Sequence, residues 1–66
     1  MEILVNGTPH IIPADTTVAQ LLVILELQDK RLAVEINQEL VSRSQFDSCV
    51  LNPHDTVEIV HAIGGG

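Results

Sequence analysis

The sequence closes on Thr56-Val57-Glu58-Ile59-Val60-His61-Ala62-Ile63, followed by Gly64-Gly65-Gly66, and these residues give the clearest indication of the fold. Polar and apolar residues alternate along residues 56–63, which predicts a strand with Val57, Ile59 and His61 on one face. Glycine loses more backbone freedom on ordering than any other residue, so residues 64–66 are predicted to form a flexible tail behind one domain of residues 1–63. A rigid strand that runs into bare glycine suggests that the working group is the C-terminal carboxylate of Gly66.

A β-hairpin is predicted at the start of the chain. Residues 2–5 alternate and are rich in strand-forming residues, and Asn6-Gly7 tolerates the positive φ angles of a type I′ turn. The second strand is expected over residues 8–12, ended by Pro13. Because Pro9 cannot donate a ladder hydrogen bond, this strand should lie at the edge of a sheet.

One main helix is predicted from Val18 to about Leu27. Thr17 and Gln20 have the spacing of a capping box at its start. Its core stripe consists of Val18, Leu21, Leu22 and Leu25. Val23, Ile24 and Leu27 lie away from this stripe, so either the core is wider than one stripe or this face meets another chain.

The remaining segments complete an α+β domain of the β-grasp type. Strands are expected over residues 32–36 and 40–41, with a turn at Asn37-Gln38 between them. Residues 42–50 should be irregular, with a helical turn around residues 44–47, and residues 52–55 turn into the last strand. The helix must pack across one face of the mixed sheet to bury its stripe, and the last strand enters the centre beside the first.

Composition limits the classes of partner. Hydrophobic residues are 45% of the 66-residue chain, the net charge is −6, and Lys30, Arg31 and Arg43 are the three basic residues. So few cations and one aromatic residue argue against nucleic acid and anionic membranes, and favour a basic protein surface as partner. Met1-Glu2 gives no positively charged start of a secretory signal, and the lone Cys49 cannot form an internal disulfide. Both features favour a cytoplasmic location.

No side chain is predicted to be catalytic or to bind a metal. Cys49 lies beside Val50 and Leu51 and is interpreted as a small core residue. The three histidines, His10, His54 and His61, show no metal-ligand spacing. No pair of carboxylates forms a convincing acid/base couple.

The period of the strands places five residues on the sheet face opposite the helix: Glu2, Leu4, Glu35, Glu58 and Val60. We interpret Leu4, Glu58 and Val60 as an apolar docking face with an acidic surround. Scattered apolar exposure is the alternative interpretation.

Three segments carry a family resemblance: residues 1–7 (Met1-Glu2-Ile3-Leu4-Val5-Asn6-Gly7), residues 33–37 with Val41-Ser42-Arg43, and residues 55–60 through Gly65-Gly66. With the element order and the length, they make the whole chain similar to the small β-grasp sulfur carriers of the thiamine pathway, the ThiS type. There are two departures. His54 stands where the family usually has glycine before Asp55, which would be strained at a positive φ, and Gly64 lengthens the tail.

The resemblance implies a mechanism. An E1-like adenylyltransferase would use ATP to adenylate the carboxylate of Gly66, and sulfur from a sulfur-donor protein would replace AMP to leave a thiocarboxylate. A thiazole synthase would then accept the sulfur for the thiazole ring. Gly64 and Gly65 would thread into the partners' active sites. The chain itself would be a protein co-substrate with no bound cofactor, not an enzyme.

Two other readings stay open at this point. One keeps the fold and changes the pathway, to a carrier of the molybdopterin synthase small-subunit type or a ubiquitin-like modifier. The other is a non-covalent β-grasp interaction module with an inert tail. Carriers and modifiers need a free terminal glycine, whereas a binding module does not.

Overall fold

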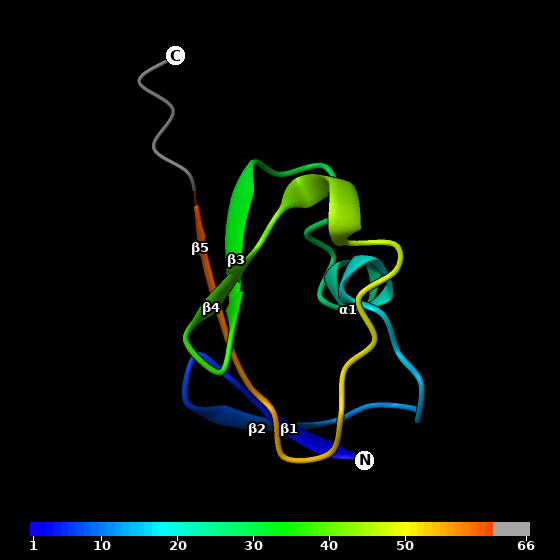
Figure 1. Ribbon diagram of the computed structural model, residues 1–66. Coiled ribbons are helices and arrows are strands. Elements are labelled where there is room, and N and C mark those ends of the chain that lie inside the picture. The colour runs from blue at the N-terminus through cyan, green and yellow to red at the C-terminus, as the bar shows by residue number, and fades with distance from the viewer. Residues whose placement is uncertain (62–66) are drawn as a thin grey trace.

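The computed structural model describes residues 1–61, which form a five-stranded sheet with one helix on one face (Figure 1). The strand order is β2-β1-β5-β3-β4. The elements are β1 (Glu2–Val5), β2 (Thr8–Ile11), α1 (Val18–Ile24), β3 (Leu32–Ile36), β4 (Glu39–Val41), the 3₁₀ helix η1 (Arg43–Gln45) and β5 (Thr56–His61). The predicted α+β class and the predicted order of elements are confirmed.

β5 occupies the centre of the sheet beside β1, as predicted. It runs parallel to β1, with Leu4 opposite Thr56, and antiparallel to β3, with Val34 opposite Ile59. β2 pairs with β1 alone and lies at the edge, so the prediction from Pro9 is also confirmed. β2 ends at Ile11, one residue before the predicted end.

The core lies between the sheet and α1. Buried side chains of β1, β3 and β5 meet Val18, Leu21 and Leu22 of the helix, together with Ile12 and Leu51 from the loops. Leu25 and Cys49 are partly buried against this cluster. Thr17 caps α1, because its side chain accepts from the Gln20 N–H at 3.2 Å while the Gln20 side chain accepts from the Thr17 N–H at 2.9 Å.

The helix is shorter than predicted and ends at Ile24. Glu26 takes a left-handed φ of 61°, and the Leu27 N–H donates to the Leu22 carbonyl at 2.7 Å, which is the Schellman pattern. This turn directs Leu27 back to the core, where it is partly buried, so its assignment to the outer helix face was wrong. Val23 and Ile24 are 56% and 50% exposed. No helix within residues 1–61 is long and apolar enough to cross a membrane.

Two further boundaries differ from the prediction. β4 begins at Glu39, one residue early, because Asn37 and Gln38 both take positive φ and close a two-residue hairpin. The predicted helical turn around residues 44–47 is η1, Arg43–Gln45. β5 is described as far as His61, which shares the inner face but is exposed at the end of the strand. Residues 62–66 lie outside the described residues, so the division into domain and tail stays a prediction.

Candidate functional site

The sheet face opposite α1 gathers the side chains that are available for contact with another protein. The strand register places Glu2 and Leu4 of β1, Glu58 and Val60 of β5, and Glu35 of β3 on this face, as predicted. It also brings Ile11, Ala33 and Leu40 there. We call this surface the outer sheet face.

The middle of the outer sheet face combines apolar and acidic groups. Val60, which is 56% exposed, lies opposite Ala33, and Glu58 lies opposite Glu35. Glu35 lies opposite Leu40 on its other side, and Leu40 is 72% exposed. Leu40 was missed from the sequence, although the two-residue turn at residues 37–38 fixes its register. Apolar side chains next to carboxylates suit a partner whose contacting surface is apolar and basic.

Leu4 is a less central part of this face than predicted. It is half-buried, and it lies opposite Thr56 at the start of β5. Val60 lies four residues beyond Thr56 along β5, and at the usual rise per residue about 13 Å separates these two positions. Glu58 lies between them, so the structure brings Glu58 and Val60 together and leaves Leu4 at the margin.

Asparagine side chains from two hairpin turns bind β5, one at Ile59 and the other at its first residue, Thr56. The Asn6 side-chain oxygen accepts from the Ile59 N–H at 2.8 Å, and its side-chain nitrogen donates to the Ile59 carbonyl at 3.1 Å. The Asn37 side-chain oxygen accepts from the Thr56 N–H at 3.0 Å, and its amide donates to Asp55 Oδ1 at 3.0 Å. Both asparagines have positive φ, 50° and 52°, which asparagine tolerates better than most residues.

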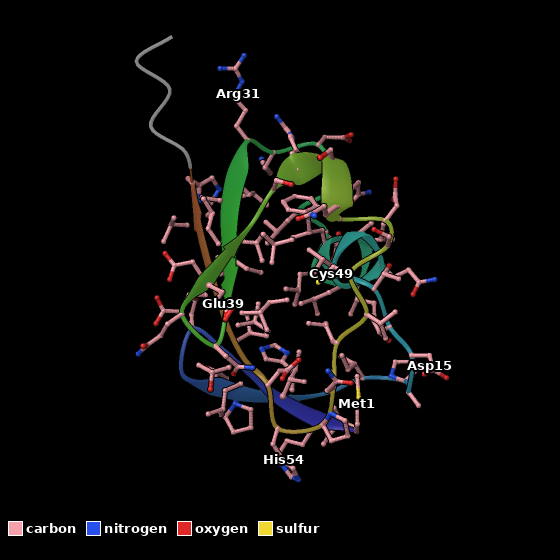
Figure 2. All side chains as sticks on the ribbon, viewed as in Figure 1. Met1, Asp15, Arg31, Glu39, Cys49 and His54 are labelled. Carbon is pink, nitrogen blue, oxygen red and sulfur yellow. The ribbon has the colours of Figure 1, made fainter. Side chains whose placement is uncertain are left out.

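The turn before β5 contains the departure noted at His54. His54 takes a φ of 69° and its N–H donates to the Glu2 carbonyl at 2.7 Å. The side chain is exposed and points away from the sheet (Figure 2). The turn therefore keeps the left-handed geometry that favours glycine, with the imidazole accommodated in solvent.

The remaining candidates form no catalytic group within residues 1–61. Cys49 belongs to the segment after η1, lies beside α1 (Figure 2) and lines an open groove of about 500 Å³. No Lys, Arg or His lines that groove, so it offers a thiolate no cationic partner. In this part of the chain, no three His, Cys, Asp or Glu side chains could together hold a metal ion. Gly64, Gly65 and Gly66 lie outside the described residues.

A family model described as the ThiS family matches residues 3–66. This chain belongs to the ThiS family of sulfur carrier proteins. The ThiS-family chain is 44% identical over all 66 residues to a thiazole synthase from Magnetococcus marinus, of which it covers 20%. It spans about a fifth of the length of the thiazole synthases it matches. Over 50 residues it is 36% identical to the sulfur carrier protein ThiS of Bacillus subtilis, covering 76% of each chain.

Solved structures agree with this assignment. The crystal structure of a thiamine biosynthesis protein (ThiS) from Geobacter metallireducens matches with a TM-score of 0.87 and 33% identity, over the full length of both chains. A solution structure of a thiamine biosynthesis protein from the same organism matches with a TM-score of 0.77 over 88% of its chain. The β-grasp fold and the resemblance to the ThiS carriers of thiamine biosynthesis are thus confirmed.

Proposed function

We propose that this ThiS-family chain carries sulfur for the thiazole ring of thiamine as a thiocarboxylate on Gly66. One observation carries the proposal: the family match extends through residue 66 and so includes the terminal glycines. The Bacillus subtilis relative, which is named a sulfur carrier protein, supports it. The proposal requires that Gly66 bear the free C-terminal carboxylate.

The chemistry needs no side chain of the carrier. The Gly66 carboxylate attacks the α-phosphate of ATP, forms an acyl adenylate and releases pyrophosphate. A persulfide of a sulfur-donor protein then attacks the acyl carbon, a C–S bond forms, and AMP leaves with the C–O bonding electrons. Reductive cleavage of the S–S bond by a thiol leaves the thiocarboxylate. An E1-like adenylyltransferase supplies the ATP site, and Gly64 and Gly65 let the tail enter it, because glycine lacks a Cβ.

Docking of the activating enzyme is assigned to the outer sheet face around Glu58 and Val60, with Leu4 at its margin. Support comes from the exposed Val60 and Leu40, which lie among Glu35 and Glu58. The net charge of −6 favours a partner whose contacting surface is basic. Charge complementarity would speed the encounter, and the apolar centre would supply the affinity.

A thiazole synthase is the proposed acceptor of the sulfur. The support is that relatives named thiazole synthase contain a region matching this whole chain, 44% and 38% identical. When two activities share one chain, the local concentration of carrier near synthase is high, which favours transfer.

The test is intact-protein mass spectrometry after incubation with ATP, a sulfur source and the E1-like enzyme. We expect one sulfur-for-oxygen exchange, localised to the C-terminal peptide by fragmentation. Localisation is essential, because oxidation of Met1 or Cys49 adds one oxygen and changes the mass almost equally. Deleting Gly66 should leave the melting temperature unchanged and abolish the exchange.

The other outcomes would replace the proposal. Attachment of the chain to lysines of other proteins would identify a ubiquitin-like modifier. An unchanged C-terminus, in the presence of an enzyme that loads another ThiS protein, would identify a non-covalent interaction module. Loaded carrier that supports molybdopterin formation and not thiazole formation would move it to the other pathway.

A further inference from the structure

Asn6 continues the ladder between β1 and β5 after its own strand has ended. The Asn6 N–H donates to the Val57 carbonyl at 2.9 Å. In a regular parallel ladder, the backbone carbonyl of Asn6 would next accept from the Ile59 N–H. Here the chain turns away into the hairpin, and the side-chain oxygen of Asn6 accepts from Ile59 instead, at 2.8 Å. The amide nitrogen then donates to the Ile59 carbonyl at 3.1 Å.

This contact is needed because β5 extends beyond the end of β1, so that part of its edge has no strand beside it. The last paired residue of β1 is Val5, opposite Val57, while β5 continues to His61. Beyond Val57, β5 is paired with β3 on one side, and its other edge faces the end of the hairpin. Ile59 is 8% exposed, so an unmet N–H and carbonyl there would be costly. Asn6 satisfies both groups across 53 residues of sequence.

Ile59, the residue that Asn6 holds, lies within the segment of β5 that is proposed to dock the activating enzyme. Ile59 stands between Glu58 and Val60, whose side chains point to the outer sheet face. The same strand leads toward Gly66 in sequence. The backbone geometry of β5 at Ile59 therefore determines how Glu58 and Val60 are oriented relative to His61, after which the sequence continues to Gly66.

We propose that Asn6 is a positioning residue for activation of the C-terminus. This inference rests on the proposed sulfur-carrier function. Asn6 touches neither the activating enzyme nor the reacting atoms. It acts through Ile59, by holding the free edge of β5 so that a docked carrier presents its C-terminus in the enzyme's adenylation site. Misplacement of reacting groups by about 1 Å can cost up to about a hundredfold in rate.

Asn37 provides a matched control. It also has a positive φ and opens a two-residue hairpin turn, and its side chain accepts from Thr56, the first residue of β5, and donates to Asp55 just before it. Asn6→Gly and Asn37→Gly each remove the amide and keep a residue that tolerates positive φ. The two variants should therefore lose similar stability while loosening β5 at different residues, Ile59 and Thr56.

Amide hydrogen exchange tests the clamp itself. We expect Asn6→Gly to speed exchange of the Ile59 amide by about tenfold or more relative to the wild type, and Asn37→Gly to do so at Thr56. Unchanged exchange at Ile59 in Asn6→Gly would show that the side chain does not hold the strand and would overturn the proposal.

Steady-state loading tests the positioning role, with the E1-like enzyme, ATP and a sulfur source at a temperature where all variants are folded. We expect kcat for Asn6→Gly to fall about tenfold, with KM within about twofold, and Asn37→Gly to keep the wild-type kcat. Asn6→Asp, which still accepts from the Ile59 N–H but repels its carbonyl, should give an intermediate kcat. An equal loss in both glycine variants, or none in Asn6→Gly, would refute positioning. Failure of the wild type to load would instead reject the sulfur-carrier function itself, and the positioning role with it.

Discussion

Glu35 and Glu58 lie directly opposite each other in the antiparallel pair of β3 and β5, on the exposed outer sheet face. Side chains in such a pair have Cβ atoms about 5 Å apart, and like charges there destabilise the sheet. The fold does not need this pair, since neither carboxylate is buried. A basic group of a partner docked as proposed would remove the repulsion, so the pair would favour that complex over the free chain.

Glu58→Gln should therefore raise stability and lower binding. We expect the free energy of unfolding to rise by about 0.2–0.5 kcal/mol, because one of two facing charges is removed. Affinity for the E1-like enzyme should fall, and should become less dependent on salt. Urea unfolding and calorimetric titration at two salt concentrations measure both effects. Glu39→Gln removes the same charge opposite Ile36 and should change neither quantity appreciably; identical behaviour of the two variants would contradict the prediction.

Val60→Asp should weaken docking without unfolding the protein. Val60 is 56% exposed, so the substitution lacks the large penalties of the core and should cost under about 1 kcal/mol. A carboxylate at the apolar centre of the outer sheet face would be desolvated in the complex. Pull-down and titration with the E1-like enzyme measure the loss. Val23→Asp is the control, since Val23 is equally exposed on α1; a similar loss there would place docking on the helix.

Cys49→Ala should leave sulfur loading intact. Cys49 is partly buried against the core and has no cationic neighbour in its groove. Loss of one sulfur atom there should cost about 1 kcal/mol of unfolding free energy or less. The measurement is thiocarboxylate formation alongside thermal unfolding. A folded Cys49→Ala protein that no longer loads sulfur would show that the thiol takes part in the chemistry.

Glu26→Gly should stabilise the fold. Glu26 ends α1 at a φ of 61°, where a side chain costs about 1 kcal/mol and glycine costs nothing. Because glycine also gains freedom in the unfolded chain, we expect a net gain of about 0.5 kcal/mol. Asp29→Gly removes the same charge at a residue without positive φ and should destabilise by about 0.5 kcal/mol. Chemical unfolding of both variants checks the difference, and equal values would show that no strain resides at Glu26.

The central strand, the edge hairpin and the start of the helix could be predicted from the sequence, because each has a local signal. Asn6-Gly7 marks a turn, and Thr17 with Gln20 marks a cap. The end of the helix had no such signal. Leu25 and Leu27 continue an apolar helical pattern, and only the hydrogen bond from the Leu27 N–H to the Leu22 carbonyl shows where the helix stops.

The candidate site was predictable in part, for a related reason. Period-two alternation assigns Glu58 and Val60 to one face, but it does not show which strands lie beside them. Leu40 joins the outer sheet face through its register with Glu35, and the Asn6 side chain reaches Ile59 from the other end of the chain. The contact of Asn6 with Ile59 joins segments distant in sequence and leaves no local pattern, whereas the register of Leu40 follows from the short turn at residues 37–38 and was overlooked.

The position of β5 also has a consequence for folding. The β1–β2 and β3–β4 hairpins can each form locally, but they share a sheet only through β5, the last strand of the described chain. Joining β1 to β5 closes a loop of nearly the whole domain, a non-local step that tends to be slow. The outer sheet face is complete only after that step, because Leu4 of β1 then lies opposite Thr56 of β5. An activating enzyme that binds this surface would therefore not bind newly made or misfolded chains. It would use ATP to adenylate only chains that have completed folding.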